Sequence, residues 1–354
     1  MPFSKKAVGQ SIDRIDGREK VLGRALFAAD HRIPDLAYAV VVQSEIPHGS
    51  VNTSGLEAVI KGASHAPGVL YILSSENCSA VKELPSELTD DFPFERRPPL
   101  SDNSVQHVGQ YVAVAVAESL ENATHAASLL HFDYEPEPAI LSAVQVTDAS
   151  GTASLGEGRV RQGSYLPDHF VKLTQEKLQD TRGHADPAVE AFRIAQTYTT
   201  PVQHHNPIEL SSTIASWNGD YLTVYDSTRW IVGSRKTIAS YLDMPEANVR
   251  IICPYVGGSF GSKSFLWQHV VLVAIAARAV GRPVKLVLTR PQMFTSVGHR
   301  PATIQEMVLG ADGDGSVAWC DTPHRNELAE RRTDCGDRAS RTALRQELVV
   351  PEGS

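Results

Sequence analysis

Val249-Arg-Ile-Ile-Cys-Pro-Tyr-Val256 runs directly into Gly257-Gly-Ser-Phe-Gly-Ser-Lys263, and this stretch decides the fold of its part of the chain. The first half is an apolar run typical of a buried strand, and the second has three glycines in five positions. A helical pattern over 265–280 and a strand-like run over 284–288 follow. The stretch therefore predicts a β-α-β unit built around a glycine turn.

The glycine turn itself indicates a binding role. Glycine loses more backbone entropy on folding than any other residue, so clustered glycines are usually kept where the backbone approaches something closely. Successive N–H groups in such a turn form a concavity for oxyanions, and the positive end of the following helix is expected at the same place. The spacing fits neither a nucleotide P-loop nor a dinucleotide fingerprint. The alternative is a tight strand-to-helix turn with no ligand.

Composition and charge limit the functional classes. The 354 residues correspond to about two domains, and a formal charge of -8 argues against nucleic acid as the main partner. The four cysteines have neither CxxC nor zinc spacing, which argues against an iron–sulfur or structural zinc site in this chain. We find no secretory signal and no apolar stretch of the ~18 residues that a membrane span needs. A soluble, cytoplasmic protein without a membrane partner is expected, or a periplasmic one if a partner carries it through export.

Strands and helices alternate along the chain, which predicts a mixed α/β (or α+β) layer architecture. The Asn218-Gly219-Asp220 turn predicts a hairpin between two of the strands. A loop is expected over 83–104, and Pro136-Glu-Pro138 is interpreted as a stiff break. Strands are expected at 37–42, 68–73, 109–117, 131–134, 192–199, 212–217, 221–225, 249–253 and 284–288, and helices at 121–130, 234–242 and 265–280.

Composition shifts divide the chain into five parts. Beyond Gly315 the regular alternation stops, and no strand or helix face is expected before 343–350. This tail is either solvated or the product of a frame lost near residue 315. The expected parts are an N-terminal extension (1–18), an α/β domain (19–140), a linker rich in Gly, Asp and Ser (141–190), a second, partial domain (191–315) and an atypical tail (316–354).

Motifs in this order resemble the molybdenum-cofactor-binding large subunit of the xanthine dehydrogenase and aldehyde oxidase family, in particular its three-subunit bacterial aldehyde dehydrogenases. The resemblance covers about residues 8–315. It rests on Arg14-Ile-Asp-Gly17, Lys20-Val-Leu-Gly-Arg24, Phe27-Ala-Ala-Asp30, Ser44-Glu-Ile-Pro-His-Gly49, Val108-Gly-Gln-Tyr-Val112, Asn206-Pro-Ile-Glu209, Val224-Tyr-Asp-Ser-Thr228, Pro254-Tyr-Val-Gly-Gly-Ser-Phe-Gly-Ser-Lys263 and His299-Arg-Pro301.

The resemblance implies a small "hammerhead" domain followed by the first part of a molybdopterin-binding domain. It also implies a bound molybdopterin with molybdenum, usually as the cytosine dinucleotide in bacteria. The implied reaction is hydroxylation of an aldehyde or N-heterocycle with oxygen from water, with electrons leaving through iron–sulfur and FAD subunits. Gly257, Gly258, Phe260 and Gly261 are then expected to hold the cofactor, with Phe260 beside the metal.

The resemblance also implies roles for three further residues. Arg229 stands 31 residues before Phe260, where the family typically has a glutamine that contacts a molybdenum oxo ligand. The alternative interpretation of Arg229 is a surface residue on the loop that leads into a helix. Ser264 replaces a glutamate typical of purine-oxidising members, which favours aldehydes as substrates. Glu209 is expected to be a structural hydrogen-bonding group near the substrate funnel and not the catalytic base.

Family members are about twice as long as this chain, and their catalytic glutamate falls in a region that has no counterpart here. No catalytic residue is therefore assigned. His204 and His205 are interpreted as core or rim histidines, and no metal ligand is assigned. Two alternatives to a molybdenum hydroxylase subunit stay open. One is a truncated, non-catalytic remnant that folds and binds partner subunits, and the other is an unrelated phosphate-binding module.

Overall fold

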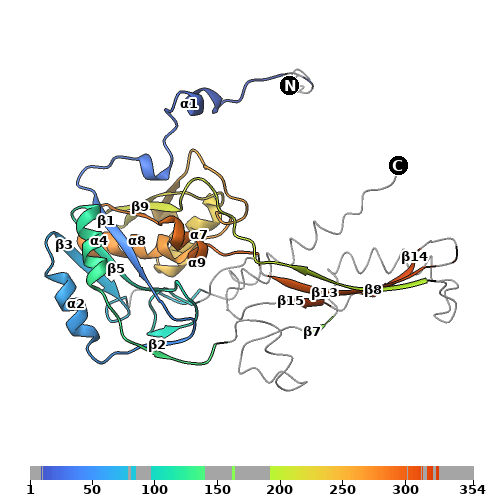
Figure 1. Cartoon of the computed structure of the whole chain (residues 1–354). Coiled ribbons are helices and arrows are strands. Elements are labelled where there is room, and N and C mark those ends of the chain that lie inside the picture. Colours follow the sequence, from blue (N-terminus) through green and yellow to red (C-terminus); the bar gives the residue numbers. More distant parts are fainter. Residues whose placement is uncertain are drawn as a thin grey trace.

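The computed structural model describes residues 11–78, 81–84, 97–139, 192–300 and 302–311, with Gly9, 162–163, Gly313, 317–321 and 324–326. Its main feature is a seven-stranded mixed sheet (Figure 1) that combines strands from distant parts of the sequence. In spatial order the strands are β11 (Val249–Ile252), β10 (Tyr221–Asp226), β9 (Ser212–Asn218), β12 (Val284–Val287), β1 (Ala37–Gln43), β5 (Tyr111–Ala117) and β3 (Val69–Ser74).

The centre of this sheet joins the two halves of the chain. β1 pairs in parallel with β12, with Ala37 opposite Val284 and Ala39 opposite Leu286. Strands from both sides of the expected 141–190 linker therefore share one hydrogen-bonded layer. Apart from β7 (Gln162–Gly163), the linker lies outside the described residues.

Helices cover both faces of the sheet. α8 (Gln268–Val280) and α7 (Ile231–Tyr241) contribute to one core, and α2 (Leu56–Ser64) and α4 (Leu120–Leu129) contribute to the other. β5 shows how its residues divide between them, because valines 114 and 116 belong to the α8 core and alanines 113 and 115 to the α2–α4 core. Successive side chains of a strand point to opposite faces, so the alternation of valine and alanine lets α4 approach the sheet closely.

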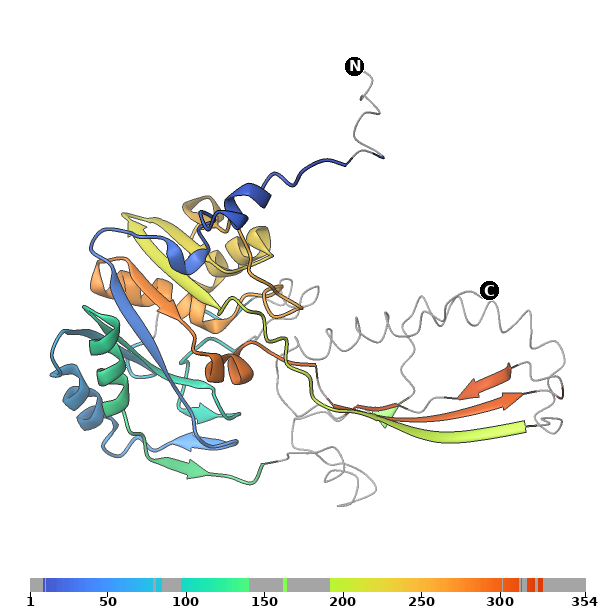
Figure 2. The same cartoon turned by 45° about the horizontal axis from the view of Figure 1, so that its top comes forward.

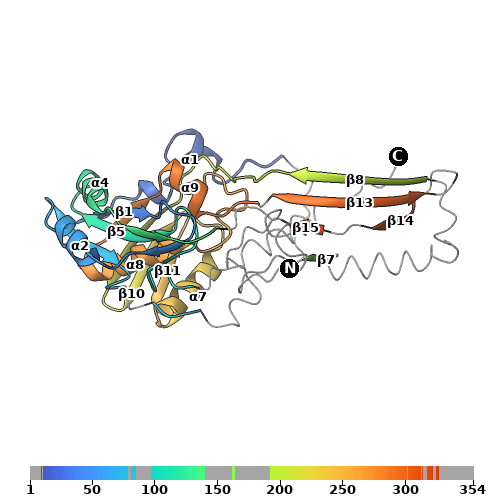
Figure 3. The same ribbon diagram turned by 60° about the horizontal axis from the view of Figure 1, so that its bottom comes forward.

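Two smaller sheets extend from the main one. A three-stranded sheet consists of β4 (Ser104–Val105), β2 (Gly49–Val51) and β6 (Tyr134–Pro136). A long two-stranded arm of β8 (Phe192–Thr200) and β13 (Thr303–Ala311) projects away from the body (Figures 2 and 3). β13 also pairs with β14 (Val317–Asp321) and β15 (His324–Asn326), and β15 pairs with β7.

Short elements complete the described chain. They are α1 (Gly17–Val21), α9 (Arg290–Ser296) and the 3-10 turns η1 (Ala28–Asp30) and η3 (Glu246–Asn248). α1 has no buried side chain. None of the helices among the described residues has the length and apolar character that crossing a membrane requires.

Most predicted elements are confirmed, including the β9–β10 hairpin at Gly219, but several bounds differ, among them that of α7, which begins at Ile231 where residue 234 was expected. The helix expected from residue 265 begins at Gln268, because Trp267 has extended backbone angles and its indole N–H donates to the Ser262 carbonyl. The strand expected at 131–134 is β6, which starts at Tyr134 and ends with Pro136 at the edge of its sheet, where a missing N–H is tolerated.

β14 and β15 are a further difference, because they lie where no strand is expected after Gly315. These two strands form because they pair with β13, and the local sequence pattern does not predict that pairing. The expected loop over 83–104 ends one residue early, since β4 begins at Ser104. The remainder of the tail beyond Asn326, and residues 85–96 of that loop, lie outside the described residues.

Candidate functional site

The glycine turn, residues 257–263, follows β11 and has an unusual backbone. Three of its residues have positive φ angles: Gly258 (103°), Phe260 (52°) and Gly261 (111°). Glycine adopts these angles without strain, whereas Phe260 does so at a cost that surrounding contacts must offset. Two bonds hold the curve from inside: the Ser262 hydroxyl donates to the Ser259 carbonyl (2.8 Å), and the Lys263 N–H donates to Ser259 Oγ (3.2 Å).

The outer side of the turn presents hydrogen-bond donors. Within the part of the chain that the structure describes, no acceptor pairs with the N–H groups of residues 258–261. The Phe260 side chain beside them is 74% exposed. Successive free N–H groups on a tight turn make a concave, electropositive surface that suits an anionic group.

The inner side of the turn packs against residues 205–209. A Cβ on Gly257 would meet the Cβ of Glu209 at 2.5 Å, and a Cβ on Gly261 would meet His205 Nε2 at 2.8 Å. The glycines are therefore needed for close packing against the protein itself. The sequence indicated either a ligand-binding turn or a tight turn without a ligand, and this packing against residues 205–209 was not predicted.

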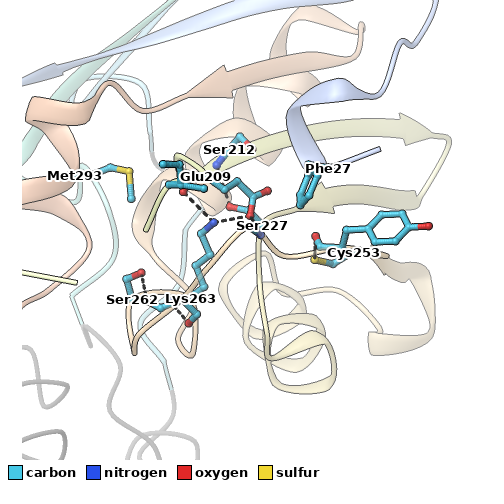
Figure 4. Close-up of polar contacts among 12 residues, drawn as sticks. Phe27, Glu209, Ser212, Ser227, Cys253, Ser262, Lys263 and Met293 are labelled. Carbon is cyan, nitrogen blue, oxygen red and sulfur yellow. Dashed lines mark hydrogen bonds and ion pairs between the residues drawn. The ribbon is translucent and has the colours of Figure 1, made fainter. Parts of the chain in front are cut away.

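A buried ion pair lies beneath the turn (Figure 4). Lys263 is 1% exposed, and its Nζ donates to Glu209 Oε2 (2.6 Å) and to the Glu209 carbonyl (3.0 Å). The Gly257 N–H donates to the same Oε2 (2.6 Å). Burial lowers the pKa of Lys263, although the hydrogen bond and the charge of Glu209 act in the opposite direction.

A second carboxyl group lies close to this pair. Asp226 ends β10, is buried, and accepts a hydrogen bond from Thr213 Oγ1 (2.6 Å). Burial raises its pKa to about 6, against the opposing effects of Thr213 and Lys263. The interior behind the turn thus contains one ammonium group and two carboxyl groups.

The structure brings all the residues of the expected site to this turn. The Arg229 N–H donates to the Lys263 carbonyl (2.8 Å), and its exposed side chain lies in the loop before α7. The Ser264 N–H donates to the Gly261 carbonyl (3.1 Å). The expected helix end is different: α8 begins at Gln268, so its first N–H groups do not belong to the turn and the prediction of a dipole at the same place is wrong.

Three residues of this region had no predicted role there. They are Lys263, Asp226 and His205, whose pKa is lowered by burial and by neighbouring His204 despite the Gly298 carbonyl. The ion-pair partners Glu209 and Lys263 are 54 residues apart, so no local pattern connects them. Among the described residues no cluster of three or more His, Cys, Asp or Glu side chains is arranged to hold a metal ion.

Two known protein families match successive parts of this chain. The family described as "Aldehyde oxidase and xanthine dehydrogenase, a/b hammerhead domain" matches residues 22–138. The family described as "Molybdopterin cofactor-binding domain" matches residues 167–328, which include the glycine turn. The chain belongs to the xanthine dehydrogenase and aldehyde oxidase family. Its fold is the family's mixed α/β arrangement, a hammerhead domain followed by part of a cofactor-binding domain.

Relatives within the xanthine dehydrogenase and aldehyde oxidase family are longer. The chain is 35% identical to the aldehyde oxidoreductase molybdenum-binding subunit PaoC of Escherichia coli O157:H7, over 88% of this chain and 39% of PaoC. It is 27% identical to the gamma subunit of the 6-hydroxypseudooxynicotine dehydrogenase complex of Paenarthrobacter nicotinovorans, over 88% of this chain and 38% of that subunit.

A solved structure gives the same result for the fold. Quinoline 2-oxidoreductase from Pseudomonas putida 86 superimposes with a TM-score of 0.72 at 22% identity, over 89% of this chain and 38% of that one. The chain therefore spans about two fifths of the length of these three relatives.

Proposed function

We propose that this chain is part of a molybdenum hydroxylase subunit that oxidises aldehydes to carboxylic acids. In this reaction the aldehyde carbon gains one oxygen atom from water, and two electrons and the released protons leave. The observation that carries the proposal is the glycine turn, whose free N–H groups lie inside the match to the molybdopterin cofactor-binding domain.

The turn fits an anionic cofactor such as molybdopterin, in its cytosine dinucleotide form. The N–H groups of residues 258–261 have no acceptor among the described residues, and Gly258 and Gly261 in this segment both have positive φ angles. When bound, the cofactor supplies the oxygen-insertion and electron-accepting chemistry. Donors that are fixed before binding stabilise negative charge without reorganisation, which is the chain's own contribution.

Other residues of the turn have distinct proposed roles. The exposed Phe260 ring would lie beside the metal and exclude water from one side. Arg229, whose main chain is tied to Lys263, would place a permanent positive charge where other members have a neutral amide. Ser264 and Glu209 are proposed to border the substrate funnel, with Glu209 in a structural role that its bonds to Gly257 and Lys263 support.

An aldehyde is the proposed substrate class for two reasons. PaoC, at 35% identity, is named an aldehyde oxidoreductase subunit. Ser264 also has no charge to pair with a purine ring. The relatives are named as subunits of larger enzymes, which supports partner subunits for this chain. We propose iron–sulfur and FAD subunits as these partners, in the cytoplasm.

The test is to purify the chain from a host that makes the cofactor and to measure molybdenum and pterin per chain. Bound molybdenum should be accompanied by turnover of aromatic or aliphatic aldehydes with an artificial electron acceptor. Gly258 has a φ angle of 103°, and an added Cβ would lie 3.2 Å from the Cβ of Pro207, so Gly258→Ala should reduce the bound molybdenum. Gly219→Ala is the matched control, because Gly219 also has a positive φ (59°) but has open space around it in the β9–β10 hairpin.

Absence of molybdenum from the wild-type chain would contradict the proposal for this chain. The partner-binding remnant would then be favoured, and it would be tested by co-purification with the iron–sulfur and FAD subunits.

A further inference from the structure

We propose that Glu209 and Lys263 are positioning residues that hold the glycine turn in its donor-presenting shape. This deepens the proposed function, since the importance of that shape rests on cofactor binding at the turn. The ion pair itself can be measured without any cofactor.

The bonding pattern shows how one residue reaches both ends of the turn. Glu209 Oε2 accepts from the N–H of Gly257, the first residue, and from Nζ of Lys263, the last residue, at 2.6 Å each. In return the Glu209 N–H donates to the Gly257 carbonyl (3.1 Å), and Lys263 Nζ donates to the Glu209 carbonyl (3.0 Å). Four hydrogen bonds to a single residue therefore fix the distance between the two ends.

The pair also sets the position of Arg229. The Arg229 N–H donates to the Lys263 carbonyl (2.8 Å), so this bond ties the loop before α7 to the last residue of the turn. A displacement of Lys263 would move this loop together with the free N–H groups of residues 258–261. The ion pair thus couples the two segments proposed to face the cofactor.

Stability alone does not require a charged pair at this place. Removing two charges from water is costly, and well-packed apolar residues in place of a buried ion pair are often neutral or stabilising. Here Glu209 Oε1 is also buried with no donor among the described residues. Charge-assisted bonds are shorter and stronger than neutral ones, which suits a role in holding the two ends of the turn together.

A double variant of the pair separates its effect on the shape of the turn from its effect on stability. The double variant Glu209→Leu/Lys263→Met removes both charges of the pair together, and Asp226 beside them keeps its hydrogen bond from Thr213 Oγ1. The control is Glu118→Leu/Arg282→Met, which removes a more exposed ion pair, between Arg282 Nη1 and Glu118 Oε1 (2.9 Å), together with the contact of Arg282 Nη2 with Asp35 Oδ1 (3.1 Å). Unfolding midpoints and amide hydrogen exchange are measured on the cofactor-free chain.

We expect the double variant to unfold within a few degrees of wild type, while the hydrogen-bonded amides of Ser262, Lys263 and Ser264 exchange at least about tenfold faster. The 111–117 peptide of β5 should be unchanged in both variants. Wild-type exchange of these three amides in the double variant would overturn the proposal. If the double variant does not fold, Glu209→Gln decides, because its amide oxygen can still accept one bond. It should give a rate between wild type and tenfold, and a wild-type rate would again overturn the proposal.

Molybdenum content provides the second readout. From a cofactor-producing host, the double variant should retain at most about one tenth of the wild-type molybdenum per folded chain, and the control should retain all of it. If the wild-type chain carries none, the proposed function fails for this chain, whereas the exchange rates still decide the role of the pair.

Discussion

At Gly257 the backbone has no room for a side chain, although its φ angle is ordinary. An added Cβ would lie 2.5 Å from the Cβ of Glu209, which cannot move without breaking its bond to Lys263. Gly257→Ala should therefore lower the free energy of unfolding by about 1–3 kcal/mol, as overpacking in tight sites does. Urea denaturation followed by circular dichroism would measure it.

Gly62 in α2 is the control for this substitution. It has no heavy atom within 4 Å of an added Cβ, and alanine favours a helix interior. Gly62→Ala should raise the free energy of unfolding by up to about 1 kcal/mol. An equal effect of both substitutions would show that the turn is not tightly packed against Glu209.

His269 on α8 should make the protein sensitive to acid. It is 1% exposed, and burial lowers its pKa from 6.5 to about 3. The unfolded chain therefore binds one more proton than the folded chain between these values, so this group's contribution to stability falls as the pH decreases through that range. Between about pH 6.5 and pH 4 the loss should be roughly 3 kcal/mol.

His269→Leu should remove this part of the pH dependence, measured by denaturant unfolding at several pH values. His125→Leu, on the exposed side of α4, should leave the dependence unchanged. Parallel curves for wild type and His269→Leu would contradict the burial effect. Asp226 acts in the opposite direction, since its pKa raised to about 6 favours the folded state at lower pH, and it is present in all three proteins.

Among the elements, α4 depends on a side-chain cap. Ser119 precedes the helix with extended backbone angles, and its hydroxyl accepts the Asn122 N–H. Ser119→Ala should cost about 1 kcal/mol of stability, because one of the first N–H groups of the helix loses its partner. Thr124→Ala removes a hydroxyl from the same helix that only donates to the Leu120 carbonyl. Its effect should stay within about 0.5 kcal/mol, and a similar cost for both would argue against the cap.

The sequence predicts elements well where one pattern determines them. After Tyr111, β5 is a continuous run of valine and alanine, and burial on both faces of the sheet is what such a run requires. The sequence pattern predicts the start of α8 three residues too early. Phe265, Leu266 and Trp267 continue the apolar pattern of the helix but precede its first turn. Leu266 is buried in the core, and Trp267 is fixed through its indole by a carbonyl of the turn.

Only those parts of the candidate site that come from contiguous sequence motifs were predictable. The turn and the residues expected to surround it follow from motifs, and the structure brings them together. The ion pair behind the turn was not predictable, since its partners come from separate segments that meet only after folding. A buried lysine also contradicts the usual exposure of that residue type, so composition gives no hint of it.

At the scale of the whole molecule, the projecting β8–β13 arm exposes apolar side chains. Phe192, Ile194 and Tyr198 are each more than half exposed on one face of β8, and one edge of this strand has no neighbour among the described residues. Long exposed strands of this kind favour self-association. The isolated chain should therefore form oligomers as its concentration increases, detected by size-exclusion chromatography with light scattering.

Ile194→Lys should shift this equilibrium toward the monomer. Thr197→Lys adds the same charge to the opposite face of β8 and is the control, expected to have the smaller effect. Equal effects would mean that net charge matters and the apolar face does not. A wild-type chain that stays monomeric at all concentrations would contradict the prediction altogether.

The parallel pairing of β1 with β12 has a consequence for synthesis. Ala37 meets Val284 in the centre of the sheet, so the ribosome must add about 250 residues between the two partners. At roughly 5–20 residues per second, β1 waits on the order of 10–50 s with one edge bare. We expect nascent chains to be most vulnerable to aggregation and chaperone capture in this interval, and to become protease-resistant in a single late step once residue 287 has left the exit tunnel.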